Sequence, residues 1–331
     1  MHHPIRLFIG TLFAGLVATM SASAGAEEIV VSNYAVSANG MPFGIALAKG
    51  YFKDEGLNIT GIISSAGGGT TLRNMLAGGG VPYGEVNPGV IVSAVLAGAD
   101  LKIVSDNVLT VAEFTWAVKP ESPIKTIKDL KGRKMGYTNP RSTSQALANM
   151  LVQSAGLRPE DVELVKTGGF GEGVAALDAG LIDITPITEP LWSKVRNKYR
   201  AVVVASEALP PLDNVVGVAT VEMMEKRGDF IRAVIRARRK AVQFMKEHPD
   251  DAGDIVAKQY NLEPEVARSA VRNLTTSTTQ GVPYWGDGQI RLEGLKRMIE
   301  AQRSVGAITG EVDFNKLIDT RFLPDDLKAI R

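Results

Sequence analysis

Short apolar strands alternate with helices along most of this chain, and this alternation restricts the fold more than any other feature. The first series has predicted strands at 29–32, 57–64, 81–86 and 101–106, separated by predicted helices at 42–53, 70–77 and 89–97. A second series follows the turn at 120–123, with strands at 134–137, 162–165, 182–185 and 201–205 and helices at 142–155, 171–179 and 190–198. Strands that alternate with helices of this length predict βαβ units, and hence an α/β protein with mainly parallel sheets.

The pattern changes at Val215. A strand at 215–220 is followed by a mostly helical tail, with amphipathic helices at 230–247, 249–259, 264–273 and 289–305. The tail is either a third domain or, more economically, a part of the first block. The second reading predicts a discontinuous lobe I (27–113 and 217–331) and a lobe II (114–216), joined by two crossover strands near 114–118 and 215–219. Two lobes suit the length, because single cores stop growing beyond about 250–300 residues.

The N-terminal segment, residues 1–26, has the pattern of a secretory signal peptide. Arg6 is its only Lys or Arg, an apolar run extends from Leu7 to Met20, and small residues fill 21–26. Cleavage is acceptable after Ala24 or Ala26; a membrane anchor or a buried helix is the alternative. The chain has no cysteine to carry a lipid. We therefore expect export and a free protein in the periplasm, without membrane insertion.

Charge and composition exclude several functions. Of the 37 Lys and Arg residues only Arg6 lies within 1–26, so the rest balance the 36 Asp and Glu residues, and nucleic-acid binding is not expected. Outside that segment the only histidine is His248, and there is no cysteine. A cysteine nucleophile is excluded, a Ser-His pair is disfavoured, and His/Cys metal-ligand spacing is absent. We expect no enzyme, metal or cofactor, with a carboxylate-only enzyme left open.

The glycine-rich segment 65–71 is the first candidate for ligand binding. It lies between a predicted strand and a predicted helix and contains Gly68, Gly69, Thr70 and Thr71. Glycine lets a ligand approach the backbone closely, and a helix N-terminus offers free N–H groups and positive potential. The segment also fits an ordinary tight turn that begins a helix.

The segment 139–144 occupies the equivalent place in the second series. It offers a guanidinium and three hydroxyl groups where a helix begins: Arg141, Ser142, Thr143 and Ser144. A hydroxyl alone can cap the helix, but an anion gains from a guanidinium together with free N–H groups. Both segments follow strands, where open α/β sheets bind ligands, so we expect them to face each other across a cleft.

Nine further residues are candidates by the same logic: Asn33, Tyr34, Asn87, Trp116, Gly169, Phe170, Thr188, Glu189 and Pro190. Trp116 and Phe170 fit either apolar walls of the site or core packing. Glu189 fits a contact to a zwitterion or a hydrogen-bond donor, and equally a helix N-terminus.

Five segments resemble a known family in their order along the chain: 48–57, 67–69, 127–134, 142–144 and 177–183. They are similar to the solute-binding proteins of nitrate/sulfonate/taurine-type ABC importers, a group that includes receptors for pyrimidine precursors and aromatic acids. The resemblance implies a two-lobed periplasmic binding protein fold that closes on its ligand, with an ABC permease and its ATPase as partners, and we expect a monomer.

The resemblance and the anion-binding features together predict a receptor for a small organic anion, such as a sulfonate, a carboxylate or a nitrate-like ion. The alternatives are a receptor for a pyrimidine or aromatic heterocycle, a sensory binding module, and a periplasmic enzyme on the same fold.

Overall fold

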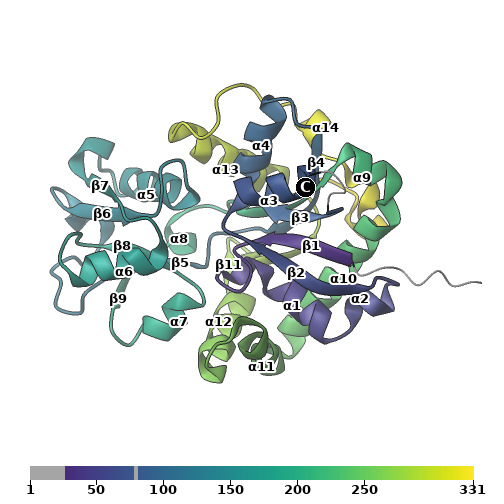
Figure 1. Ribbon diagram of the computed structural model, residues 1–331. Helices are drawn as coiled ribbons and strands as arrows, with labels where there is room; N and C mark the ends of the chain where they lie inside the picture. The colour runs from purple at the N-terminus through teal and green to yellow at the C-terminus, as the bar shows by residue number, and fades with distance from the viewer. Residues whose placement is uncertain (1–26, 78–80) are drawn as a thin grey trace, which may run out of the picture.

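The computed structural model describes residues 27–77 and 81–331, so the predicted signal peptide and its cleavage positions lie outside the described residues. The chain forms two lobes of unequal size (Figure 1). Each lobe has a hydrophobic core of its own. Among the described residues, no helix has the length and apolar character that a membrane span requires.

Lobe I is built on a six-stranded sheet of order β13-β4-β10-β3-β1-β2. Strand β1 pairs in parallel with β2 and β3, whereas β10 pairs antiparallel with β3 and β4. The strands are β1 (Glu27–Ser32), β2 (Ile59–Ser65), β3 (Gly84–Val86), β4 (Leu101–Val108), β10 (Val215–Thr220) and β13 (Trp285–Gly288), and the pair β11 (Thr278–Thr279) and β12 (Val282–Pro283) lies apart.

Helices from both ends of the chain cover this sheet. The tail helix α10 buries an apolar stripe that includes Ile231, Val234 and Val242, and it packs against α1. The helices of lobe I are α1 (Met41–Ala48), α2 (Tyr51–Asp54), α3 (Gly68–Leu76), α4 (Pro88–Leu96), α9 (Val221–Lys226), α10 (Gly228–Glu247), α11 (Pro249–Tyr260), α12 (Pro264–Thr276), α13 (Leu292–Ser304) and α14 (Phe314–Leu317). The tail thus shares one core with the first strands; the domain boundaries themselves stay a prediction.

Lobe II contains a three-stranded sheet of order β8-β5-β9 and the parallel pair β6-β7. Its strands are β5 (Phe114–Val118), β6 (Lys134–Tyr137), β7 (Glu163–Lys166), β8 (Thr185–Thr188) and β9 (Arg200–Val204). Its helices are α5 (Thr143–Ser154), α6 (Phe170–Asp178), α7 (Leu191–Val195) and α8 (Ala205–Ala208).

The sheets are less uniformly parallel than the sequence suggests. Both crossover strands were predicted near their observed positions, and both pair antiparallel with their neighbours: β5 with β8 and β9, and β10 with β3 and β4. The chain enters each lobe along these strands from the side at which the βαβ strands end, so their direction is reversed.

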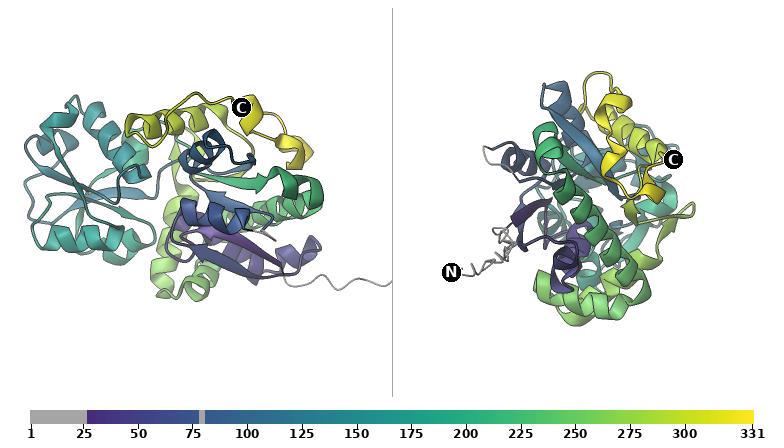
Figure 2. Two further views of the ribbon diagram at one scale, coloured as in Figure 1. Left: turned by 45° about the horizontal axis from the view of Figure 1, so that its top comes forward. Right: turned by 90° about the vertical axis from the view of Figure 1, so that its right-hand side faces the viewer.

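Helix α13 forms a third link between the lobes. It packs against α4 of lobe I and α5 of lobe II, as Figures 1 and 2 show. Its fully buried Met298 belongs to the hydrophobic core of lobe II. A tail helix therefore helps to fix the geometry of the space between the lobes.

Candidate functional site

A cavity of about 190 Å³ lies between the lobes, and we call it the interlobe cavity. It is smaller than the roughly 300–1,000 Å³ of sites for drug-sized ligands, and so suits a small solute. Eight of the predicted residues line it: Asn33, Gly68, Asn87, Ser142, Thr143, Ser144, Phe170 and Thr188.

Four helices begin at the interlobe cavity. Gly68 is the first residue of α3, Asn87 is the N-cap of α4, Ser142 is the N-cap of α5, and Phe170 is the first residue of α6. Helix N-termini carry unpaired N–H groups and a partial positive charge, and each favours an anion. The cavity is therefore suited to negative charge although no Lys or Arg is found among its described lining residues.

A cluster of hydroxyl groups forms the lobe II wall. Ser142 Oγ accepts a hydrogen bond from the N–H of Gln145 at 3.2 Å, which is the predicted helix cap. Ser144 Oγ accepts from the N–H of Thr138 at 3.0 Å and lies 2.8 Å from Thr138 Oγ1 and 2.9 Å from Ser142 Oγ. The same hydroxyls thus begin the helix and line the cavity, so the two readings of this segment are compatible.

Hydrogen bonds join the lobes beside the cavity. Asn87 Nδ2 donates to Thr143 Oγ1 at 2.9 Å and to the carbonyl of Asn214 at 3.0 Å, while Asn87 Oδ1 accepts from the N–H of Gly89 at 2.8 Å. Gln302 Nε2 of α13 donates to Thr143 Oγ1 at 3.4 Å. Thr143 Oγ1 therefore accepts hydrogen bonds from side chains of two lobe I helices and lies at the centre of this contact between the lobes.

A buried polar network supports the lobe I wall. Asn39, which lines the cavity, donates from Nδ2 to Glu85 Oε2 at 2.9 Å, and Asn107 donates to Glu85 Oε1 at 2.8 Å. Arg238 lies 3.8 Å from the same carboxylate and donates to the carbonyls of Gly286 and Asn107. Burial raises the pKa of Glu85 to about 6, against the opposing effect of Arg238, so the carboxylate is charged at neutral pH.

Four predicted residues of lobe I lie outside the lining of the interlobe cavity. Thr71 is fully buried behind it, within hydrogen-bond distance of Ser32 and Ser65. The neighbouring Gly69 is exposed, and Thr70 Oγ1 accepts from Arg73. Tyr34 packs edge-on against Tyr260. Thr71 thus shapes the turn from within instead of facing the space between the lobes.

Five predicted residues of lobe II also lie outside this lining: Trp116, Arg141, Gly169, Glu189 and Pro190. Trp116 is fully buried in the lobe II core, which is the core-packing alternative. Glu189 is buried and accepts from Ser193 and Asn273, so its carboxylate is already satisfied. Arg141 is exposed, with a positive φ of 65° that directs this residue out of the helix start. A guanidinium at the cavity was the expectation, and the cavity instead relies on helix N-termini and hydroxyls.

The sequence interpretation missed eight lining residues: Ser32, Ser37, Asn39, Glu113, Phe114, Thr138, Asn214 and Val215. Ser32 and Thr138 end or follow strands beside residues that were predicted. Glu113 and Asn214 directly precede the crossover strands β5 and β10, where polar residues interrupt apolar runs. That interruption is the signal that identifies them.

Two buried carboxyl groups meet where the chain crosses between the lobes. Asp213 precedes β10 and interacts with Asp106 of β4; both are buried, and neither oxygen of Asp213 has a hydrogen-bond donor. Desolvation and, for Asp213, the charge of its neighbour raise the pKa of both groups. The folded protein therefore holds protons that the unfolded chain releases above about pH 4.

We expect the replacement Asp213→Asn to stabilise the protein at pH 8. Because the pKa values of Asp106 and Asp213 are raised, the contribution of this pair to stability is largest at acidic pH and is lost as pH rises through the folded-state values. The amide stays neutral and can donate to Asp106, so the variant should gain at least about 1 kcal/mol at pH 8 and little at pH 5. Thermal unfolding at both pH values measures this, with the exposed Asp229→Asn as control. Equal effects of the two variants at pH 8 would contradict the pairing.

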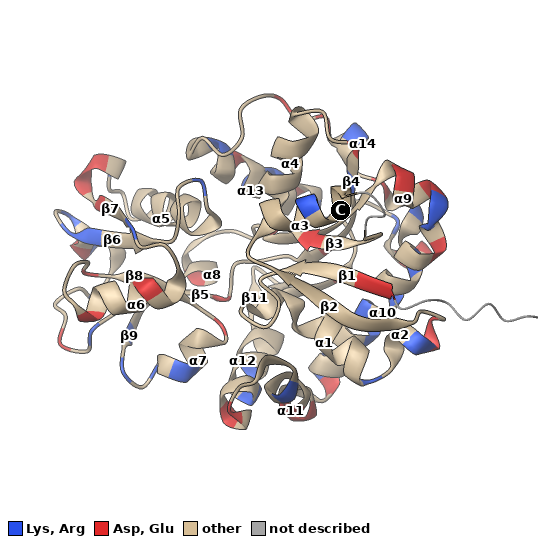
Figure 3. Ribbon diagram, in the orientation of Figure 1, with Lys and Arg blue, Asp and Glu red and all other residues tan. Residues whose placement is uncertain are grey.

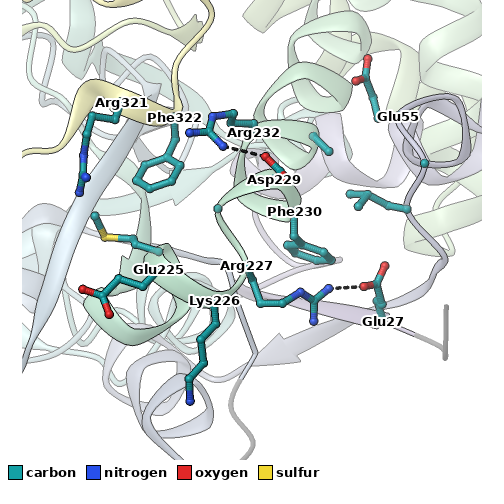
Figure 4. A pocket seen from close by; sticks show the side chains of 15 residues that line it. Glu27, Glu55, Glu225, Lys226, Arg227, Asp229, Phe230, Arg232, Arg321 and Phe322 are labelled. Carbon is teal, nitrogen blue, oxygen red and sulfur yellow. Dashed lines mark hydrogen bonds and ion pairs between the residues drawn. The ribbon is translucent and has the colours of Figure 1, made fainter. Parts of the chain in front are cut away.

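A larger cavity, of about 610 Å³, lies at the far end of lobe I. Glu27 lines it and Ser32 lines the interlobe cavity, so the two cavities lie at opposite ends of β1. Figure 4 shows that its charged side chains pair with one another, Arg227 with Glu27 and Arg232 with Asp229. Figure 3 shows Lys and Arg interspersed with Asp and Glu over both lobes. The charges of this cavity are thus largely neutralised, and it is the weaker candidate.

Comparisons with known proteins agree with this architecture. Residues 37–252 match the model of a family described as NMT1/THI5 like. A candidate aliphatic sulfonates-binding protein of Bacillus subtilis (strain 168) is 23% identical over 273 residues, which are 79% of this chain and 81% of that protein.

Two solved structures illustrate the likeness in fold. The periplasmic aliphatic sulphonate binding protein SsuA from Escherichia coli superposes with a TM-score of 0.73 at 21% identity, covering 89% of this chain and 92% of that chain. The periplasmic nitrate-binding protein NrtA from Synechocystis PCC 6803 gives a TM-score of 0.69 at 14% identity, covering 91% and 86%. These matches confirm the predicted fold and the family resemblance.

Proposed function

The chain belongs to the NMT1/THI5-like family, and from this premise we propose that it is the solute-binding component of an ABC import system, which captures a small organic anion between its two lobes in the periplasm. The observation that carries the anion is the convergence of four helix N-termini and a hydroxyl cluster on one small cavity. Sulfonates are the first candidates, because the relatives named above bind sulfonates or nitrate according to their names.

Binding would hold the lobes together through contacts made to both. Gly68 and Asn87 belong to lobe I, and Ser142 to Ser144 belong to lobe II. Only a ligand that interacts better with one arrangement of the lobes shifts their equilibrium. A ligand between α3 and α5 makes such contacts, and the arrangement it favours is the one that we propose an ABC permease recognises, with its ATPase as the further partner.

A receptor for an aromatic or pyrimidine-like heterocycle is the second candidate function. Phe114 and Phe170 both line the cavity, with ring centroids 5.9 Å apart and planes at 68°. Asn87 and Asn214 add side-chain amides, which can pair with ring nitrogens and carbonyl groups. In either case the protein would return its ligand unchanged, as a binding protein and not an enzyme.

A thermal-shift screen of residues 27–331 tests this function. The panel contains ethanesulfonate, nitrate, benzoate and uracil. A ligand at about 100 times its Kd should add roughly 2.7 kcal/mol of stability, which corresponds to about 5–10 °C. We expect such a shift with at least one anion. A shift with uracil alone would favour the second candidate, and a panel ligand that comes back chemically altered would indicate an enzyme.

A further inference from the structure

The carboxyl group of Glu113 is an unusual component of the interlobe cavity. Glu113 lies at the junction of the lobes, directly before β5, and lines the cavity with only 4% of its surface exposed. Its Oε1 accepts a hydrogen bond from Asn214 Nδ2 at 2.5 Å. Its Oε2 is buried and makes no hydrogen bond of ordinary geometry, although the Tyr284 hydroxyl lies beside the carboxyl group. A buried polar atom without a full hydrogen bond is costly, and an oxygen of a bound ligand would offset this cost.

The groups around Glu113 provide no positive charge. Asn214 and the Tyr284 hydroxyl face the carboxyl group from the segments before β10 and β13, and the backbone N–H of Glu113 itself also faces it. The backbone N–H of Glu189 donates to the carbonyl oxygen of Glu113. Among the described residues that line the cavity, Glu113 is the one Asp, Glu, Lys or Arg. Desolvation raises the pKa of Glu113 to about 8, and the pKa of Tyr284 lies well above its usual value, so both are neutral at pH 7.

The arrangement also locates the proton. Because Oε1 accepts from Asn214, the acidic hydrogen belongs on Oε2. A carboxylic acid held in this way is a hydrogen-bond donor, as the helix N-termini and hydroxyls of the cavity are. These donors together suit a ligand that carries hydrogen-bond acceptors and negative charge.

We propose that Glu113 is a specificity-determining residue that binds the solute as a neutral carboxylic acid, with Oε2 donating a hydrogen bond to an oxygen of the bound anion. This inference rests on the proposed anion receptor and adds a condition to it. Ionised Glu113 would repel the anion across a cavity of about 190 Å³. Capture is therefore coupled to one proton that the protein, and not the ligand, carries.

The affinity for the anion should fall as the pH rises. The anion binds the protonated form, so binding is strongest below the pKa of Glu113 and is lost as pH rises through it. With that pKa at about 8, the affinity should fall about tenfold between pH 7 and pH 9. Ethanesulfonate and nitrate do not titrate in this range, so a loss of affinity would come from a titrating group of the protein.

The experiment is a calorimetric titration of ethanesulfonate, nitrate and benzoate into residues 27–331 at pH 6, 7, 8 and 9. We expect the wild type to lose about tenfold in affinity for the bound anion between pH 7 and pH 9. Glu113→Gln keeps an N–H donor at the same place, so it should bind within about threefold of wild type at pH 7 and stay level to pH 9. Glu172→Gln is the matched control. It removes an exposed carboxylate from the first turn of α6, outside the cavity lining, and should keep the wild-type slope.

The outcomes separate this inference from the proposed function. A wild type that binds an anion with no loss at pH 9, or a Glu113→Gln variant that loses tenfold or more at pH 7, would overturn the role of Glu113 and leave the anion receptor in place. No binding of any of the three anions at any pH would overturn both. A flat wild-type profile overturns the role of Glu113 even where the variant fails to fold. A slope that persists in folded Glu113→Gln would assign the pH dependence to the Asp106–Asp213 pair and also overturn the proposal.

Discussion

Replacing Arg238 with leucine should lower the free energy of unfolding by about 3–5 kcal/mol, because the change leaves the buried Glu85 carboxylate without its cation. Arg238 is 2% exposed and donates at 2.6 Å to the carbonyls of Gly286 and Asn107, so both acceptors also lose a donor. The Glu85 carboxylate also accepts a hydrogen bond from Asn39, which lines the interlobe cavity. The loss of stability should therefore be accompanied by weaker ligand binding.

Denaturant unfolding followed by tryptophan fluorescence measures this effect. The adjacent Arg239 is the matched control, since it lies on the same helix but pairs with Asp326 at the surface. Exposed ion pairs contribute only about 0–1 kcal/mol, so Arg239→Leu should change little. Similar losses in the two variants would contradict the structural role of the network around Glu85.

Replacing Thr143 with glutamate should reduce anion affinity at least about 100-fold. Thr143 is the first residue of α5 and lines the interlobe cavity, so the new carboxylate would occupy the place of the anion. Two like charges about 4 Å apart interact by about 4 kcal/mol at an effective dielectric constant of 20. The fold should tolerate the change, because an acidic residue in the first helical turn is favourable and Asn87 and Gln302 can donate to it.

Titration calorimetry compares this variant with Gln145→Glu. Gln145 lies in the same turn of α5, accepts from the backbone N–H of Arg141 at 2.7 Å, and is not part of the cavity lining. The control adds the same charge outside the cavity, where solvent screens it, and should lose less than about fivefold. If the two variants lost similar amounts of affinity, the anion would be responding only to the overall charge near α5 and would not bind at Thr143.

Much of the fold could be predicted from the order of strands and helices. The periodicity of 29–32, 57–64 and 134–137 placed β1, β2 and β6 within a few residues of their observed bounds. The antiparallel pairing of β5 and β10 could not be predicted in this way, because strand direction depends on where the chain crosses between the lobes. The packing of Met298 in the core of lobe II could not be predicted either, since the pattern of an amphipathic helix does not indicate which of two cores it contacts.

Several lining residues that follow strands were predicted, whereas the two polar lining residues that precede the crossover strands were missed. Gly68 and Ser142 follow β2 and β6, as the rule for parallel sheets requires. Glu113 and Asn214 lie at the beginning of antiparallel crossover strands, to which that rule does not apply. Arg141 was expected at the cavity from its charge and its place beside the start of α5, whereas it is exposed, has a positive φ of 65° and lies outside the cavity lining.

Native mass spectrometry tests whether the interlobe cavity binds one small anion. Residues 27–331, freed of ligand by unfolding and refolding, are offered an equimolar mixture of ethanesulfonate, nitrate, benzoate and uracil. We expect one adduct per wild-type chain with the mass of an anion, and no such adduct on the Thr143→Glu variant. Binding of uracil alone, or an anion adduct that persists in Thr143→Glu, would contradict it.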